Sequence, residues 1–206
     1  MNSLGTSSIK MACGLFVIAV AWFALITQWC ITTFGFVDFI SFFTIQCNLL
    51  VALCVSFSLL LPQSAPGRFF SKSSVQSAIA LYIFIVGLVY NTVLRGLYEF
   101  KGMQVVVDNL LHVVVPVLYI MYWYAFTSHT FFRWKQCLYW LIYPLLYTMY
   151  SMIRGSLVHW YPYPFLNAQD LGYPKVFVNM LAVLAAFCIT GLIVIGINRR
   201  AKDKAV

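Results

Sequence analysis

The chain has 206 residues, of which 63% are hydrophobic and only 9% charged, and its mean hydropathy is +0.89. These values lie outside the range of soluble globular domains and within that of proteins embedded in a bilayer. The formal net charge of +8 does not indicate nucleic-acid binding, because the basic residues are thinly spread over short connecting segments that form no basic groove.

Six apolar segments follow one another along the chain, each about long enough to cross roughly 30 Å of hydrocarbon as a helix. We place them at residues 11–32, 37–61, 75–94, 106–126, 138–153 and 176–197. The connections are too short to be folded domains. The sequence therefore predicts one domain, residues 1–206, that is an all-α, polytopic bundle of six transmembrane helices. The first segment is too long for the apolar part of a signal peptide, so we expect it to be retained.

The distribution of basic residues predicts the orientation of this bundle. Of the 13 Lys and Arg residues, nine fall on the side of the two termini and four on the other side. The positive-inside bias therefore places both termini in the cytoplasm. The nine are Lys10, Arg68, Lys72, Arg133, Lys135, Arg199, Arg200, Lys202 and Lys204, and the four are Arg95, Lys101, Arg154 and Lys175.

The cysteines and histidines show no spacing typical of a metal site. The six cysteines fall in or beside the apolar segments without a CxxC pair, and we interpret them as small buried hydrophobic residues. The three histidines, His112, His129 and His159, are far apart in the sequence. We therefore expect neither a metal nor another cofactor.

Polar side chains within the second, third and fourth segments share one predicted depth. Given the orientation above, they lie near the outer ends of these segments, and on each helix they are spaced four residues apart, on one face. Lipid cannot hydrogen-bond such groups, so we expect them to point into the bundle and line a pocket open to the outer surface. They are Thr44, Asn48, Asn91, Arg95, Asp108 and His112.

The composition of this cluster suits hydrolysis. Thr44 can supply an alkoxide nucleophile, His112 can accept its proton, and Asp108 can hold the imidazole tautomer and stabilise the imidazolium. His112 is the most informative of the three, because a titratable ring in an uninterrupted apolar stretch is costly. Pro116 lacks the N–H that would bond the carbonyl of His112 in an α-helix, so we expect the helix to bend there.

Three further members of the cluster have predicted supporting roles. A backbone oxyanion hole is not expected on unbroken helices, so Asn48 and Asn91 are the candidate oxyanion donors. Arg95 can hold the carboxylate of an acidic lipid. Each of these residues also has a purely structural interpretation, since polar residues in membrane helices often bond a backbone carbonyl or bridge two helices.

Five segments carry a resemblance to a known family: residues 42–50, 87–96, 108–119, 140–144 and 160–167. The last contains the block Trp-Tyr-Pro-Tyr-Pro-Phe-Leu-Asn. Together they resemble the bacterial predicted six-transmembrane protein family. More distantly, the chain is similar to the animal androgen-induced and androgen-dependent integral membrane proteins, which are threonine hydrolases of fatty acid esters of hydroxy fatty acids. The resemblance implies catalytic roles for Thr44 and His112, although Cys47 stands where the animal motif has an acid.

The leading hypothesis is an integral membrane hydrolase of lipid esters, with membrane lipids and a lipid ester as partners. We expect it in the cell membrane, which is the inner membrane in a bacterium that has two. The alternative is a small transporter or ligand-binding membrane protein in which Arg95, Asp108 and His112 form the site. A third possibility is a non-catalytic scaffold whose polar residues only set the helix register.

Overall fold

The computed structural model describes residues 3–203, and the side chains of residues 7–200 among them. Within this part all regular structure is helical. The described residues form two compact units: unit 1 comprises those up to Phe34 together with Thr44–Ser128, and unit 2 comprises Gly35–Phe43 together with those from His129 onward. Lys204, which was counted in the charge bias, lies outside the described residues, as does the side chain of Lys202.

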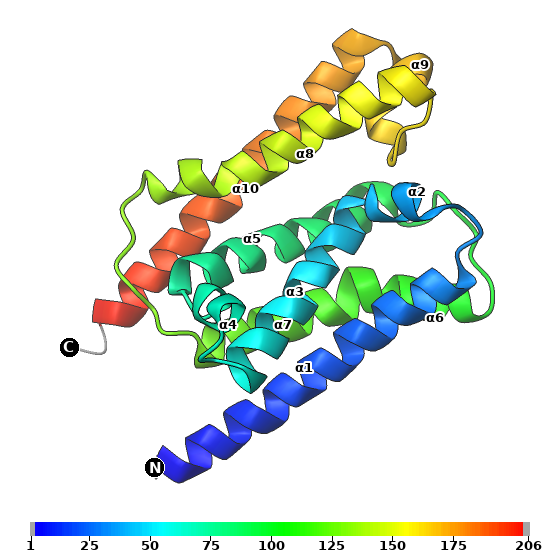
Figure 1. Cartoon of the computed structure of the whole chain (residues 1–206). Helices are drawn as coiled ribbons and strands as arrows, with labels where there is room; N and C mark the ends of the chain where they lie inside the picture. The colour runs from blue at the N-terminus through cyan, green and yellow to red at the C-terminus, as the bar shows by residue number, and fades with distance from the viewer. Residues whose placement is uncertain (1–2, 204–206) are drawn as a thin grey trace. The chain divides into compact units, whose positions relative to one another are not determined.

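Unit 1 is built from long helices interrupted at a few places (Figure 1). In chain order they are α1 (Ser3–Ile31), α3 (Phe43–Leu60), α4 (Ala65–Phe70), α5 (Ser73–Val89), η1 (Tyr90–Leu94), α6 (Met103–Asn109), η2 (Leu110–Val114) and α7 (Val115–Phe126). Helix α7 packs against both α5 and α1. Fully buried hydrophobic side chains of this unit include Ala21, Val51, Leu81, Ile83, Val115 and Tyr119.

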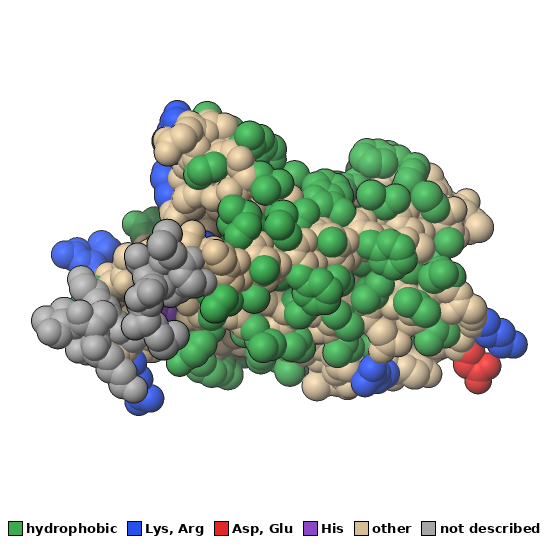
Figure 2. All heavy atoms as spheres, turned by 90° about the horizontal axis from the view of Figure 1, so that it is seen from below, with side chains coloured by type: hydrophobic (Ala, Val, Ile, Leu, Met, Phe, Trp, Pro, Cys, Tyr) green, Lys and Arg blue, Asp and Glu red, His purple; other side chains and the backbone are tan. Residues whose placement is uncertain are grey.

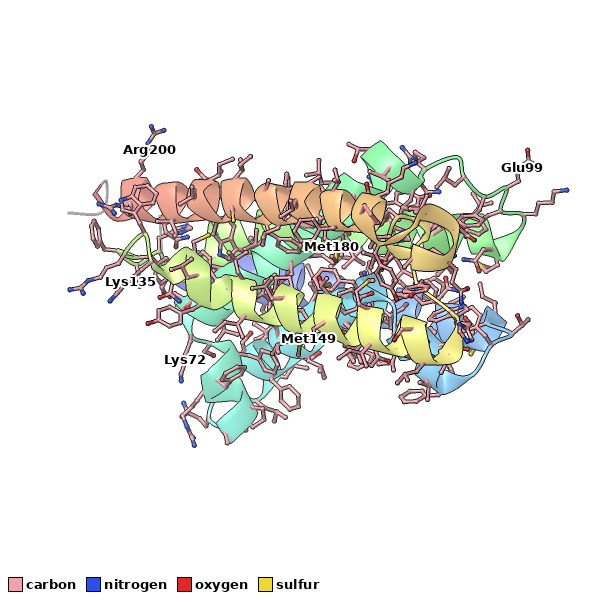
Figure 3. All side chains as sticks on the ribbon, turned by 90° about the horizontal axis from the view of Figure 1, so that it is seen from above. Lys72, Glu99, Lys135, Met149, Met180 and Arg200 are labelled. Carbon is pink, nitrogen blue, oxygen red and sulfur yellow. The ribbon has the colours of Figure 1, made fainter. Side chains whose placement is uncertain are left out.

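Unit 2 is built on a pair of long helices. In chain order its elements are α2 (Phe36–Ile40), α8 (Gln136–Val158), η3 (Pro164–Leu166), α9 (Ala168–Leu171) and α10 (Tyr173–Asp203). Helices α8 and α10 lie side by side, and Figure 3 shows Lys135 and Arg200 at the same end of the pair. Because Lys135 precedes α8 and Arg200 lies near the end of α10, the two helices are antiparallel.

Five of the six predicted spans are confirmed as helices that are long and apolar enough to cross a membrane. They cover Ser7–Ile31, Phe43–Leu60, Ser73–Leu94, Met103–Phe126 and Tyr173–Arg200. Helix α8 occupies the place of the remaining predicted span but is richer in tyrosine and other polar residues. Large apolar side chains are exposed along these helices, and Figure 2 shows hydrophobic side chains spread over the face seen from below. The chain is therefore a multi-pass membrane protein.

Three irregularities interrupt the predicted uniform spans. The second span breaks at Ser41 and Phe42, between α2 and α3. The third ends in the π-helical turn η1, and the fourth contains the π-helical turn η2. A π turn inserts one extra residue into the helix and shifts every later side chain around the axis, and such turns occur often at functional sites. All three irregularities lie next to residues of the predicted polar cluster.

Candidate functional site

Thr44 and His112 face each other across two helices of unit 1. Thr44 is the second residue of α3, and His112 is the central residue of η2. The Thr44 Oγ1 atom lies 3.3 Å from His112 Nε2. Thr44 is buried, and the side chain of His112 is 14% exposed. The two atoms are therefore in hydrogen-bond contact, slightly beyond the roughly 2.6–3.2 Å of direct proton transfer, as is common at sites without bound substrate.

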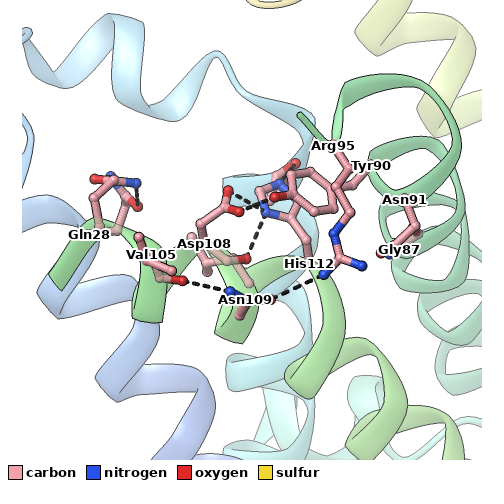
Figure 4. A network of polar contacts seen from close by, with 12 residues as sticks. Gln28, Gly87, Tyr90, Asn91, Arg95, Val105, Asp108, Asn109 and His112 are labelled. Atoms are coloured by element: carbon pink, nitrogen blue, oxygen red, sulfur yellow. Dashed lines mark hydrogen bonds and ion pairs between the residues drawn. The ribbon is translucent and has the colours of Figure 1, made fainter. Parts of the chain in front are cut away.

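The other ring nitrogen of His112 is held by Asp108 in two ways (Figure 4). Nδ1 lies 2.9 Å from the Asp108 backbone carbonyl oxygen and 3.1 Å from the carboxylate oxygen Oδ1. Both oxygens only accept hydrogen bonds, so Nδ1 carries the proton. In the neutral ring, Nε2 then has a lone pair directed at the Thr44 hydroxyl. This is the tautomer that a general base for Thr44 needs.

Tyr90 completes the environment of the imidazole. Its ring stacks on that of His112, with centroids 4.0 Å apart and planes inclined by 12°. Its hydroxyl donates a hydrogen bond to Asp108 Oδ2. The carboxylate is thus bonded through one oxygen to His112 and through the other to Tyr90, while the stacked ring fixes the plane of the imidazole. Both contacts restrict His112 to the orientation that faces Thr44.

The π turn around His112 changes the expected effect of Pro116. In η2 the N–H of Val115 bonds the carbonyl five residues back, that of Leu110. In the same register, the N–H that proline lacks would have bonded the carbonyl of Leu111. That carbonyl accepts a hydrogen bond of 3.1 Å from Asn48 Nδ2. The carbonyl that loses its helical N–H donor is thus that of Leu111, one residue before the expected carbonyl of His112.

Asn48 therefore joins two helices through their backbones. Its Nδ2 also donates to the carbonyl of Thr44, at 2.9 Å, so both amide hydrogens are directed at carbonyl oxygens. The residue is completely buried, and its Oδ1 has no hydrogen-bond partner. In this arrangement Asn48 positions α3 beside the segment that carries His112. It has no N–H left for the predicted oxyanion role.

Asn91 and Arg95 lie at the rim of this cluster. Asn91 is exposed and donates to the carbonyl of Gly87, at 2.7 Å, and Figure 4 draws no bond between its amide and the residues around His112. The guanidinium of Arg95 lies over the ring of Tyr90, 5.8 Å from its centroid, and Nη2 donates to Asn109 Oδ1 at 3.3 Å. Arg95 is exposed. The structure thus joins Arg95 to the cluster through Tyr90 and leaves the Asn91 amide outside it.

A pair of glutamines ties α6, which carries Asp108, to α1. Gln28 Nε2 donates to Gln104 Oε1 at 3.3 Å, and Gln104 Nε2 donates to Gln28 Oε1 at 3.0 Å. Gln104 and Asp108 are four residues apart and share a face of α6. The reciprocal bonds therefore fix the first turns of the helix that orients the imidazole.

The helix dipole of α3 contributes to the local field at Thr44. Thr44 lies in the first turn of an 18-residue helix, where the helix dipole favours negative charge. Among the described residues, no group of three or more His, Cys, Asp or Glu side chains is placed to hold a metal ion. The arrangement is a buried threonine hydroxyl beside one nitrogen of an imidazole, with a carboxylate beside the other nitrogen.

The sequence pattern did not predict the roles of three residues in this site: Tyr90, Gln28 and Gln104. Tyr90 directly precedes Asn91, and an α-helical register gave no reason to place its ring on His112. The two glutamines carry no charge, and only their position within apolar segments marks them.

No family model, curated protein or solved structure that was compared matches this chain. The fold and the site define an all-helical, multi-pass membrane protein with a buried Thr–His–Asp cluster.

Proposed function

We propose that this protein is an integral membrane hydrolase that cleaves lipid esters, with Thr44 as nucleophile and His112 as general base. The observation that carries the proposal is the 3.3 Å distance between Thr44 Oγ1 and His112 Nε2. The other ring nitrogen, Nδ1, contacts the backbone carbonyl oxygen and the carboxylate oxygen Oδ1 of Asp108.

In the first half of the reaction, Nε2 of His112 takes the hydroxyl proton while Thr44 Oγ1 attacks the ester carbonyl carbon. The Asp108 carboxylate stabilises the imidazolium that forms. As the tetrahedral intermediate collapses, the bond to the alcohol oxygen breaks and the imidazolium returns the proton to that oxygen. The products of this half are the free alcohol and an acyl ester on Thr44.

In the second half, Nε2 takes a proton from water and the resulting hydroxide attacks the acyl carbon. Collapse of this second intermediate breaks the bond to Thr44 Oγ1, which regains the proton from the imidazolium. A fatty acid leaves. One ester and one water are thus converted into one alcohol and one acid, and no cofactor is needed.

The developing oxyanion needs stabilisation from a source other than the predicted asparagine amides. Thr44 is the second residue of α3 and so lies at the N-terminal end of this helix. An oxyanion on the carbonyl attacked by Thr44 forms at this positive end of the helix dipole, which favours it.

The substrate enters from the bilayer in this proposal. Arg95 is exposed, and its guanidinium packs on the ring of Tyr90, so it can bind an acidic group on a lipid ester whose carbonyl reaches Thr44. We further propose that α8 is the sixth span and that both termini are cytoplasmic, as the basic residues favour. The site then opens to the outer leaflet of the cell membrane.

The test is hydrolysis of p-nitrophenyl esters of graded chain length by purified protein in maltoside micelles. Thr44→Val keeps the shape of the side chain and removes the hydroxyl, so hydrolysis should fall to background, as it should in His112→Ala. Thr92→Val is the matched control, because Thr92 is an exposed threonine that bonds its own helix, and its activity should be unchanged. Wild-type rates in both Thr44→Val and His112→Ala would refute the proposal.

A second candidate is transport of a small anion or a proton-coupled solute. The observation in its favour is the break between α2 and α3, since interrupted helices line the binding sites of many transporters. The two functions differ in their dependence on Thr44. Uptake into proteoliposomes that survives Thr44→Val, combined with no ester hydrolysis by the wild type, would favour transport.

A further inference from the structure

A second polar cluster lies in unit 2, where α8 approaches its end. Arg154 Nη2 forms an ion pair with Asp38, and the guanidinium carbon lies 4.8 Å from the centroid of the Trp160 ring. Tyr147 donates to the carbonyl of Ser41 at 2.9 Å. Nearly every polar group of this cluster therefore has a partner within the unit.

Two atoms of the cluster are exceptions. Ser151 Oγ and Arg154 Nη1 are buried, and neither has a hydrogen-bond partner. Ser151 is only 1% exposed. The two residues are three positions apart on α8, so their side chains leave the same face of the helix within about 6 Å of each other. Leaving a buried donor without an acceptor costs about 1–3 kcal/mol, so two adjacent ones indicate a site that an acceptor oxygen occupies.

The charge of the cluster selects a neutral acceptor. Asp38 already neutralises Arg154, and the nearby C-terminal end of α8 presents the negative end of its dipole. An anionic ligand would therefore gain little electrostatic binding energy at this cluster. A carbonyl oxygen has two lone pairs, so a single one can accept from both Ser151 and Arg154.

The neighbouring surface of α8 fits an acyl chain. Leu146, Met149, Ile153 and Leu157 are all at least half exposed, and their spacing places them in one stripe along the helix. At 100° per residue, Tyr150 and Arg154 lie between this stripe and Ser151. A chain lying on the stripe can thus direct a carbonyl past the Tyr150 ring toward the two donors.

We propose that Ser151 and Arg154 form a binding site for the ester carbonyl of an uncharged lipid, whose acyl chain lies along the exposed stripe of α8. The site belongs entirely to unit 2. It does not rest on the hydrolase proposal, and it remains a binding site whether or not Thr44 is a nucleophile.

The test compares two matched lipids, 1-oleoylglycerol, which has an ester carbonyl, and 1-O-oleylglycerol, in which an ether replaces it. Both are titrated into full-length Thr44→Ala protein in dodecyl maltoside, a detergent without ester groups, so that no turnover at the proposed nucleophile depletes the probe. Binding is read from the fluorescence of Trp160, identified by its loss in Trp160→Phe, and independently from the shift in melting temperature. The ester should bind about five- to tenfold more tightly than the ether, the value of one to two net hydrogen bonds.

The variant Ser151→Ala removes one donor without breaking any bond in the unliganded protein. It should weaken ester binding by about fivefold, leave ether binding unchanged, and not lower the melting temperature without lipid. Ser156→Ala is the matched control, because Ser156 is exposed on the same helix and bonds the carbonyl of Ile153. Equal affinity for ester and ether, or an unchanged ester affinity in Ser151→Ala, would overturn the proposal. Tighter binding of oleate than of the ester would also overturn it, by assigning an anion site.

Discussion

The substitution Asp108→Asn separates two roles that one carboxylate usually combines. Where a carboxylate alone orients a catalytic histidine, its amide lowers the rate by about 10⁴, because the wrong tautomer is held. Here the Asp108 backbone carbonyl, 2.9 Å from His112 Nδ1, is untouched by the substitution. The Asn Oδ1 can also keep the 3.1 Å contact, while its Nδ2 donates to the Tyr90 hydroxyl. Nδ1 therefore keeps its proton, and only the negative charge is lost.

The expected loss follows from the bond that changes. A hydrogen bond to a charged group contributes about 1.5–3 kcal/mol and a neutral one about 0.5–1.5 kcal/mol. Replacing the first by the second, and losing some attraction to the imidazolium, costs about 1–3 kcal/mol, or about five- to 150-fold in kcat/KM for a p-nitrophenyl ester. Asp170→Asn, at an exposed aspartate of α9, should have wild-type activity. A loss of about 10⁴ would refute the role of the backbone carbonyl, and no loss would refute that of the carboxylate.

Three further substitutions test the packing that positions the site and unit 2. Asn48→Leu loses both bonds that join the helix backbones and should cost about 1–3 kcal/mol of stability; an unchanged melting temperature would contradict this. In Gly87→Ala the new Cβ would lie 3.2 Å from the carbonyl oxygen of His112, so hydrolysis should fall several-fold while stability changes by about 1 kcal/mol or less; full activity would show that the contact yields freely. Gly155→Ala places a Cβ within 2.5 Å of three ring carbons of Tyr161 and should destabilise the protein by about 1–3 kcal/mol, as a lower melting temperature would show.

The sequence predicted the parts of the site that depend only on depth and helical spacing. Thr44 and His112 were expected at one level because they lie near the outer ends of the second and fourth apolar segments. Asp108 and His112 were expected on one face because they are four residues apart, and the structure joins them through Nδ1. Five of the predicted spans followed from length and hydropathy alone.

The remaining features depend on where the helices depart from α geometry. In η1 the N–H of Arg95 bonds the carbonyl of Tyr90, five residues back, so the guanidinium lies over Tyr90 and not beside Asn91. Contrary to the sequence prediction, Asn91 and Arg95 therefore do not share one face of the helix. In η2 the same extra residue moves the vacant carbonyl to Leu111, where Asn48 bonds it. Nothing in the residue pattern distinguishes a π turn from an α turn, so these roles emerge only from the fold.

The proposed covalent step at Thr44 is the most direct point at which to test the central claim. Purified protein is treated with a fluorophosphonate, digested, and the modified peptide is identified by mass spectrometry. The mechanism predicts one phosphonate adduct on Thr44, absent in Thr44→Val and strongly reduced in His112→Ala, whose nucleophile lacks its base. An adduct on any other residue, or labelling of Thr44 at the wild-type rate without His112, would contradict it.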